Sequence, residues 1–196
     1  MNTIQIQANF HSYWHIGTGR GSGYYIDSLV ERDADGLPYV PGKTLKGLMR
    51  DAFYKLYKWD HIEEFLLEQL FGKRGHATDE TRNDTSQGLL RFSSLELPEK
   101  AFLGQDSQID LKQHLFQTLS STAIDETTGV AKDKSLRMIE VSIPVTLKGE
   151  IEVLDTQNFT LAEDDLKELI AQASSLITNI GANKTRGFGA VTLEVK

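Results

Sequence analysis

Cysteine is absent from this sequence. Its absence excludes disulfide bonds, thiolate zinc sites and cysteine nucleophiles, and it favours a reducing compartment, so we expect a cytoplasmic protein. Long apolar runs are absent too, and none approaches the roughly 18 residues that a membrane span requires. The opening segment, MNTIQIQANF, also lacks the charged start and apolar block of a secretory signal. We therefore expect no membrane partner.

Positive charge is in short supply as well. The chain has 21 Lys and Arg against 28 Asp and Glu, for a formal net charge of -7. A free-standing nucleic-acid-binding domain is usually basic, so this balance argues against binding through the surface as a whole. It does not exclude binding through a local basic surface, because association depends on where the charges lie. Of the 196 residues, 39% are hydrophobic, which is enough for one substantial core or two small cores that share an interface.

Hydrophobic periodicity predicts the main elements in the order strand, helix, strand, strand, helix, strand. Alternating apolar residues mark the strands, and apolar residues at helical spacing mark the helices. This order is that of a ferredoxin-like βαββαβ domain, an α+β fold that RNA-binding modules often use. The expected ranges, in chain order, are 3–10, 43–58, 88–97, 136–154, 160–180 and 188–195, and the range 136–154 holds two strand-like runs separated around Pro144.

The segments between these elements have weaker patterns. Asp60 with Glu63 resembles a capping box, which predicts an additional helix that ends at Gly72. Lys73–Gln87 is polar and has no period, so it is predicted to be a mobile loop. A weak helix is expected over Asp110–Leu119.

The stretch GANKTRGFG, Gly181–Gly189, joins the last predicted helix to the last strand, and we call it the terminal glycine loop. Thr160 is expected to cap that helix, and Gly181 to end it. Glycine lets a backbone approach phosphate closely, while Lys184 and Arg186 add positive charge beside exposed amides. The alternative is a helix C-cap and a tight turn with incidental charge.

Two other features of the sequence bear on RNA binding. The stretch RGFGAV resembles the RNA-recognition-motif signature, but that signature belongs on the third strand, and here it would lie on the fourth.

In YVPGKTLKGLMRDAF, the side chains of Lys43, Lys46 and Arg50 share one face near the helix start, and we call them the basic helix face. A helix N-terminus attracts phosphate, and these charges would strengthen the attraction. A solvated basic face without a ligand is the alternative.

Taken together, YVPGKTLKGLMR and GANKTRGFG resemble the RAMP superfamily of CRISPR-associated RNA-binding proteins. HIGTGRG, at 15–21, resembles the family's first glycine-rich turn. YYIDSLVERDADGLPYVPG, at 24–42, resembles the segment before the basic helix in the backbone subunits of type III effector complexes. AIDETTGVAKDKSLRMIEVSIP, at 123–144, resembles their thumb-like β-hairpin. The resemblance spans nearly the whole chain.

The resemblance implies a single domain over 1–196, with a ferredoxin-like palm, an inserted loop at about 73–87 and a thumb at about 120–144. The palm would be built from about 2–16, 43–58, 88–97 and 145–195. Backbone subunits of the family stack along a guide RNA, and each thumb crosses the guide–target duplex. The implied partners are guide (CRISPR) RNA, target RNA, other effector subunits and further copies of this chain. The implied RNA-binding residues are His15, Gly17, Lys43, Lys46, Arg50, Lys132, Lys134, Arg137, Lys184, Arg186, Gly187 and Gly189.

The resemblance also implies a catalytic residue. In type III complexes, an aspartate in the loop before the basic helix supports metal-dependent cleavage of target RNA, and the matching residue is Asp27. A carboxylate can hold a divalent metal, expected here to be Mg²⁺, or act as a base toward the ribose hydroxyl. The alternative is that Asp27 is a turn or cap residue. Asp33 and Asp35 are rivals, but their DADG run is typical of a turn.

Other functions stay open at this point. The chain could be a RAMP scaffold or capping subunit that binds guide RNA without cutting. It could also be a guide-processing ribonuclease that uses His11 or His15, although no second catalytic partner for them stands out. His61, His76 and His114 lack ligand spacing, so we predict no zinc site. The acidic composition and the segment 73–87, which matches no family motif, depart from the family's pattern.

Overall fold

The computed structural model describes residues 3–23, 25–73, 86–98, 111–154 and 161–196. Its main sheet has four antiparallel strands in the order β2–β5–β1–β6. This is the ferredoxin-like order, in which the first strand lies between the third and the fourth strands of the βαββαβ repeat. The predicted α+β fold class is therefore confirmed. The strands are β1 (Thr3–Phe10), β2 (Leu90–Phe92), β5 (Thr146–Val153) and β6 (Val191–Val195).

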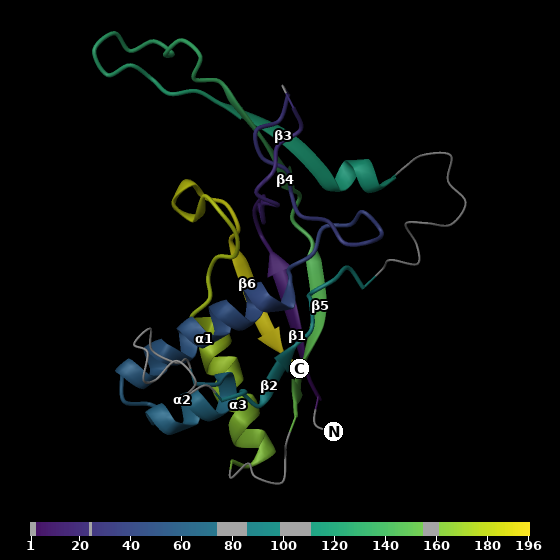
Figure 1. The fold of residues 1–196 in the computed structure, drawn as a ribbon, viewed down its shortest axis with the longest axis vertical. Coiled ribbons are helices and arrows are strands. Elements are labelled where there is room, and N and C mark those ends of the chain that lie inside the picture. The colour runs from purple at the N-terminus through teal and green to yellow at the C-terminus, as the bar shows by residue number, and fades with distance from the viewer. Residues whose placement is uncertain (1–2, 24, 74–85, 99–110, 155–160) are drawn as a thin grey trace.

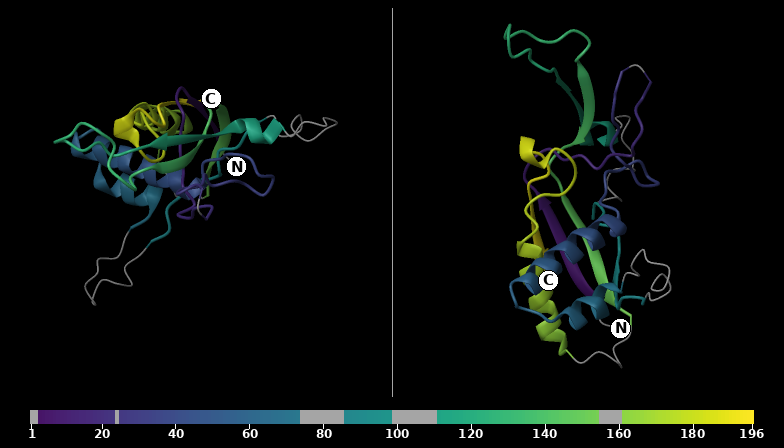
Figure 2. Two further views of the ribbon diagram at one scale, coloured as in Figure 1. Left: turned by 90° about the horizontal axis from the view of Figure 1, so that it is seen from above. Right: turned by 60° about the vertical axis from the view of Figure 1, so that its left-hand side comes forward.

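One face of this sheet is apolar, and the other is polar. Along β1, Ile4, Ile6 and Ala8 are buried, while the residues between them are exposed or half-buried. The buried face packs against α1 (Gly42–Lys58) and α3 (Glu163–Ser175), as Figures 1 and 2 show. We call the sheet with α1 and α3 the palm. The open face of the described strands carries no aromatic side chain, so it lacks the stacking platform of an RNA-recognition motif.

The helices form where the apolar stripes predicted them. On α1 the buried side chains recur at helical spacing and face the sheet. The stripe predicted for the last helix is also in the core, but α3 ends at Ser175 and Leu176 caps it. The predicted stop at Gly181 is therefore wrong. The backbone turns after Ser175, and Ile177 and Ile180 reach the core from an irregular segment. The buried residues of α1 are Leu45, Met49, Ala52, Phe53 and Leu56.

Two predicted helix starts are not as expected. The helix α2 (Glu64–Phe71) begins after Glu63, and no side chain caps it. Asp60 instead adopts a left-handed φ of 59° and donates its amide to the Tyr57 carbonyl, which ends α1. The predicted capping box is therefore wrong, whereas the predicted end of α2 at Gly72 is confirmed by its φ of 87°. Thr160 lies outside the described residues, and the position before α3 is Ala162, without a side-chain cap.

A second, two-stranded sheet replaces the helix predicted over 110–119. A short 3-10 helix, η2 (Leu111–Leu115), leads into β3 (Phe116–Ser121), which pairs antiparallel with β4 (Arg137–Ser142). The partner strand satisfies the backbone hydrogen bonds of β3, and a local pattern could not reveal that pairing. We call β3, β4 and their connecting loop the thumb hairpin (116–142). Figure 1 shows that its loop projects beyond the palm.

The other predicted strands are shorter than expected. β2 covers three residues of the predicted 88–97, and beyond it Leu95 pairs with Val40 and Glu96 with Lys148 as isolated bridges. β6 begins at Val191 rather than at 188. Of the predicted mobile loop 73–87, residues 74–85 lie outside the described residues.

The thumb hairpin is joined to the palm at Trp14. The Trp14 side chain is fully buried, stacks on Phe10 with ring centroids 4.4 Å apart, and donates its indole N–H to the Ile143 carbonyl at 3.0 Å. Its backbone pairs with Ser142 at the end of β4. The core of the palm and the base of the thumb hairpin therefore share this residue.

The two tryptophans of the chain provide a matched test of that role. Trp14→Phe should lower the free energy of unfolding by about 2 kcal/mol or more, because it leaves a cavity and removes the hydrogen bond to the part-buried Ile143 carbonyl. Trp59→Phe should change it by less than about 0.5 kcal/mol, because Trp59 is 55% exposed. Urea denaturation followed by circular dichroism measures both. Equal effects would contradict the proposed junction.

Candidate RNA-binding surface

The terminal glycine loop is a closed loop whose two ends are bonded to the chain after β1. The Ile180 amide donates to the Gly189 carbonyl at 2.9 Å and closes the loop. The Ala182 amide donates to the His15 carbonyl and the Gly189 amide to the Tyr13 carbonyl, each at 2.8 Å. These bonds fix the base of the loop relative to β1 and leave its tip in solvent.

The tip of the loop carries the positive charge. A 3-10 turn, η3 (Lys184–Arg186), lies between two residues with left-handed backbone, Asn183 and Gly187. Lys184, Arg186 and Gly187 are exposed. Neither basic side chain has a hydrogen-bond or ion-pair partner within the described part of the chain. The loop therefore presents two cations that are available to an anion.

Gly189 has a different role from the one expected. It is buried, its φ is 71°, and a Cβ there would collide with the Ile180 carbonyl oxygen. Its amide is already used by Tyr13. Gly189 thus permits the loop to close, and it offers no group to RNA.

His15 is buried, and the exposed Gly17 lies directly against its ring. His15 is 5% exposed, its Nδ1 donates to the Glu140 carbonyl at 2.7 Å, and its Nε2 lies 3.0 Å from the Ser28 hydroxyl. A carbonyl only accepts hydrogen bonds, so Nδ1 carries a proton. A Cβ at Gly17 would lie 2.7 Å from His15 Nε2. In this arrangement His15 holds neighbouring segments together, and its ring has no free nitrogen for RNA.

The basic helix face is divided between two roles. Lys43 and Lys46 line a surface cavity of about 220 Å³ beside β2, together with Arg91, and neither lysine has a partner among the described residues. Arg50 instead donates to the Gly72 carbonyl at 3.1 Å, at the C-terminal end of α2. Lys43 and Lys46 are therefore available to an anion, and Arg50 connects two helices.

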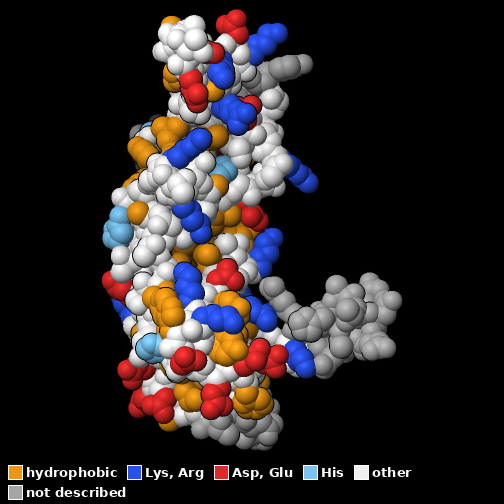
Figure 3. All heavy atoms as spheres, turned by 90° about the vertical axis from the view of Figure 1, so that its left-hand side faces the viewer, with side chains coloured by type: hydrophobic (Ala, Val, Ile, Leu, Met, Phe, Trp, Pro, Cys, Tyr) orange, Lys and Arg blue, Asp and Glu red, His pale blue; other side chains and the backbone are white. Residues whose placement is uncertain are grey.

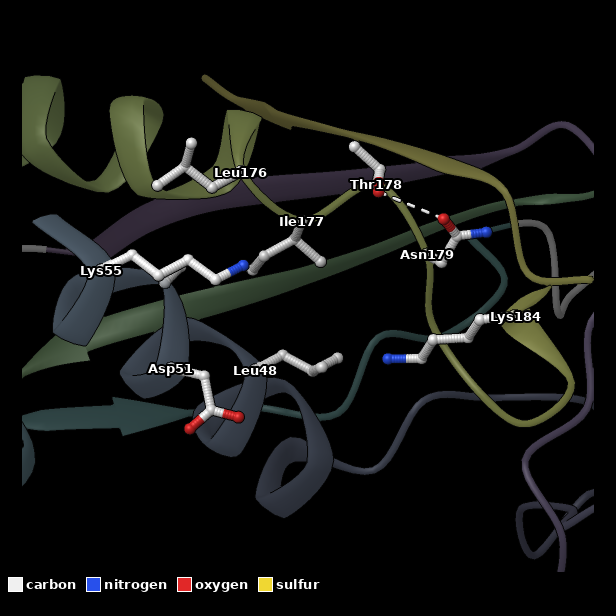
Figure 4. Close-up of a pocket in the computed structure, with 9 residues that line it drawn as sticks. Leu48, Asp51, Lys55, Leu176, Ile177, Thr178, Asn179 and Lys184 are labelled. Carbon is white, nitrogen blue, oxygen red and sulfur yellow. Dashed lines mark hydrogen bonds between the residues drawn. The ribbon is translucent and has the colours of Figure 1, made fainter.

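Lys184 and the basic helix face lie on different flanks of α1. Lys184 faces a separate cavity between α1 and the segment after α3, as Figure 4 shows. Lys43 and Lys46 line the cavity on the β2 side. Lys184 therefore lines a different cavity from Lys43 and Lys46. Figure 3 shows basic side chains distributed along this face from the thumb hairpin to the helices.

Asp27 lies beside the start of β4, near the loop of the thumb hairpin. Its amide donates to the Met138 carbonyl at 2.8 Å, and the Met138 amide donates to its Oδ2 at 2.7 Å. The Glu140 amide donates to the Ser28 carbonyl at 3.0 Å. The segment before α1 is therefore paired with β4, and Asp27 remains exposed with Oδ1 unbonded among the described residues.

The structure also identifies Glu140, which the sequence did not single out. Glu140 is 7% exposed; its Oε1 binds Arg32 Nη2 at 2.7 Å and its Oε2 accepts the Val30 amide at 3.0 Å. The Arg32 guanidinium lies over the Phe116 ring, 3.8 Å from its centroid. One carboxylate thus connects the Asp27 segment with β4, while Arg32 reaches β3. A single glutamate within a strand-like run gives no local signal of this role.

The loop of the thumb hairpin exposes the remaining predicted residues. Lys132, Lys134 and Arg137 are all exposed. The loop is ordered by Asp125, whose Oδ1 accepts the amides of Thr127 and Thr128 at 2.9 and 3.0 Å. The hydrogen bonds from Thr128 and Thr127 hold the pKa of the Asp125 carboxyl below its usual value. Lys132 and Lys134 are therefore displayed on a loop with its own hydrogen bonds, and Arg137 lies beside that loop at the start of β4.

Two further properties of the described residues concern metal sites and membrane-spanning helices. No group of three or more His, Asp and Glu side chains suited to a metal ion occurs within the described residues. No helix in the same part of the chain is long and apolar enough to cross a membrane.

This geometry defines a ferredoxin-like protein with a projecting hairpin and exposed basic loops. A model of the RAMP superfamily matches residues 7–192, so the chain belongs to that superfamily, and the resemblance seen in the sequence is confirmed. No curated protein matches the sequence.

Solved structures with a similar fold include chains of the type III-B Cmr-beta complex. A chain of the apo state has a TM-score of 0.66 at 12% identity, covering 98% of this chain and 96% of that one. A chain of the complex bound to cognate target RNA has a TM-score of 0.66 at 12% identity, covering 100% and 97%. At this identity the likeness concerns the fold.

Two Arg–Glu ion pairs, Arg32–Glu140 and Arg91–Glu152, allow a matched test of Glu140. Glu140→Ala should lower the free energy of unfolding by about 2 kcal/mol, because it leaves the Val30 amide and Arg32 without their acceptor. Glu152→Ala removes the partner of the largely exposed Arg91 and should cost less than about 1 kcal/mol. Hydrogen exchange should quicken at residues 25–32 only in the first variant. Unchanged exchange there would show that Glu140 does not hold this segment.

Proposed function

We propose that this protein is a guide-RNA-binding backbone subunit of a type III CRISPR ribonucleoprotein. The observation that carries the proposal is the exposed pair Lys184 and Arg186, which have no partner among the described residues and lie on a loop whose base is bonded to the chain after β1. A loop whose backbone is held at its base loses less conformational entropy when it binds phosphate. Membership of the RAMP superfamily and the likeness of fold to Cmr-beta chains, one of them in a complex bound to target RNA, support it.

Guide phosphates would be bound by Lys184 and Arg186 and, on the other flank of α1, by Lys43 and Lys46. The thumb residues Lys132, Lys134 and Arg137 would contact the guide–target duplex. All of these are contacts between cations and phosphate, which position a nucleic acid without reading its sequence. Other effector subunits and further copies of this chain are the proposed protein partners.

We also propose that Asp27 makes the chain a metal-dependent RNA endonuclease within the complex. Oδ2 is bonded to Met138, and Oδ1 is the oxygen that would hold a divalent metal, expected to be Mg²⁺. A lone carboxylate fits this ion, because Mg²⁺ commonly takes one or two carboxylates and completes its ligands with water and substrate phosphates. When bound, such an ion supplies charge stabilisation at the phosphate.

The chain's own contribution is positional. The Met138 amide orients the Asp27 carboxylate, and Glu140 holds the same segment against β4. Met138 lies close to the loop of the thumb hairpin, so a duplex that this loop distorts would lie near Asp27. In-line geometry at the ribose is the requirement that such a distortion would meet.

A non-catalytic scaffold or capping subunit is the second candidate. The 2.7 Å bond from the Met138 amide favours it, because this bond gives the Asp27 carboxylate a structural role that requires no catalysis. A guide-processing ribonuclease has less support. His15 is buried with both ring nitrogens engaged, and His11 Nε2 is bonded to the Thr192 hydroxyl at 2.8 Å.

Asp27→Asn separates these candidates. Asparagine keeps an oxygen for the Met138 amide but removes the charge, so the loop should stay in place. In the complex assembled with guide and target RNA, we expect target cleavage at this subunit to fall by a factor of about 100 or more, with target binding unchanged. Asp35→Asn, in the same segment, is the control and should cut normally. Cleavage that survives Asp27→Asn would favour the scaffold.

Arg186→Gln tests the guide-binding surface. Loss of one phosphate contact should weaken binding of single-stranded RNA by about 5-fold and reduce the slope of log affinity against log salt by about 0.7. Lys167→Gln, an exposed lysine on α3, is the control and should alter neither quantity. Fluorescence anisotropy with labelled RNA at several salt concentrations measures both. If Arg186→Gln behaves like the control, the loop does not bind RNA.

A further inference from the structure

A cleft of about 270 Å³ separates α1 from the segment that follows α3. Figure 4 shows its two walls. Lys55 extends into it from α1, and Lys184 extends into it from the terminal glycine loop. Lys55 lies on the flank of α1 that carries Leu48 and Asp51, and it was not among the residues predicted to bind RNA.

The neutral polar groups of the cleft are satisfied within the protein. The Thr178 hydroxyl donates to Asn179 Oδ1 at 3.1 Å, and Asn179 Nδ2 donates to the Phe188 carbonyl at 3.0 Å. The ammonium groups of Lys55 and Lys184 have no hydrogen-bond or ion-pair partner in the described ranges, and neither has the Asp51 carboxylate. The donors left for a ligand are therefore the two cations.

We propose that this cleft binds one phosphate of single-stranded RNA between Lys55 and Lys184. The inference rests on the proposed guide binding and extends it to a site that also uses the second half of α1. Two cations against one carboxylate leave a net positive charge, and a concave wall focuses the field of that charge on an incoming phosphate. Ammonium groups bind phosphate as point charges, so two on opposite walls suit an anion placed between them.

Asp51 allows a test that distinguishes phosphate binding from a role in packing, because removing its charge should raise RNA affinity. Its carboxylate lines the same cleft and repels phosphate, so Asp51→Asn should tighten RNA binding. Lys55→Gln and Lys184→Gln should each weaken it. The same cleft thus predicts opposite effects from neighbouring exposed residues on one helix, Asp51 and Lys55.

The test uses the full chain and a labelled single-stranded RNA of mixed sequence. We expect Lys55→Gln and Lys184→Gln each to weaken binding by about 5-fold, and Asp51→Asn to strengthen it by about 2-fold. Because the two lysines share one phosphate, the double variant should lower the salt slope by about 0.7 rather than twice that amount. Lys167→Gln is the control, and urea denaturation checks that each variant folds.

The outcomes separate this inference from the proposed function. If Lys184→Gln and Arg186→Gln weaken binding but Lys55→Gln and Asp51→Asn do not, the shared phosphate site is overturned and guide binding by the loop stands. If the unmodified chain shows no salt-dependent RNA binding, both fail. If Lys55→Gln retains RNA affinity but loses binding of polyglutamate, the cleft takes an acidic protein segment, and the inference is overturned.

Discussion

The buried carboxylate of Glu140 is the interaction on which the arrangement of the site depends. A carboxylate with little solvent contact is stable as an ion only when both oxygens have partners, and here they bind Arg32 and the Val30 amide. Because those partners belong to the segment before α1, the charge fixes that segment against β4. Asp27 and β4 consequently occupy fixed positions relative to each other. The backbone carbonyl of the same glutamate accepts from His15, which extends the connection to the chain after β1.

The acidic net charge and the proposed RNA surface are compatible because charges of opposite sign lie in different places. The first turn of α3 carries Glu163, Asp164 and Asp165, which interact favourably with the helix dipole. Figure 1 places that turn at the end of the molecule opposite the thumb hairpin. The terminal glycine loop lies between these ends. A total charge averages over such a distribution, so it has little bearing on local phosphate binding.

Much of the fold was predictable from the sequence, because the palm depends on local patterns. The alternation in β1 and the apolar stripes of α1 and α3 each report directly on burial. β4 was expected, as a strand-like run before Pro144 and as part of the thumb-like hairpin that the family resemblance implied. β3 was not, because its residues after Phe116 are exposed or half-buried and give little hydrophobic pattern. The predicted capping box of Asp60 and Glu63 was wrong because a cap depends on the direction of the backbone. At Asp60 the backbone turn is set by the end of α1, and the side chain does not reach the next helix.

The sequence indicated which types of residue form the candidate site, but not how their side chains are arranged in space. Lys184 and Arg186 are exposed cations, as their polar setting indicated, but nothing in the sequence showed that Lys55 would face Lys184. Nor could spacing along α1 show that Arg50 reaches the end of α2. Gly189 looked like a phosphate-binding glycine. It is instead buried against the Ile180 carbonyl at the other end of the loop, a contact that the sequence does not reveal. Glu140 and Lys55 are meaningful only through contacts with distant segments.

The outer part of the thumb hairpin has its own hydrogen bonds. Ala123, Lys132 and Ser135 bond to one another, and Asp125 orders the turn between them. Insertions or deletions in this loop therefore need not disturb the packing of the palm. The length of the thumb hairpin and the stability of the palm core can thus change independently.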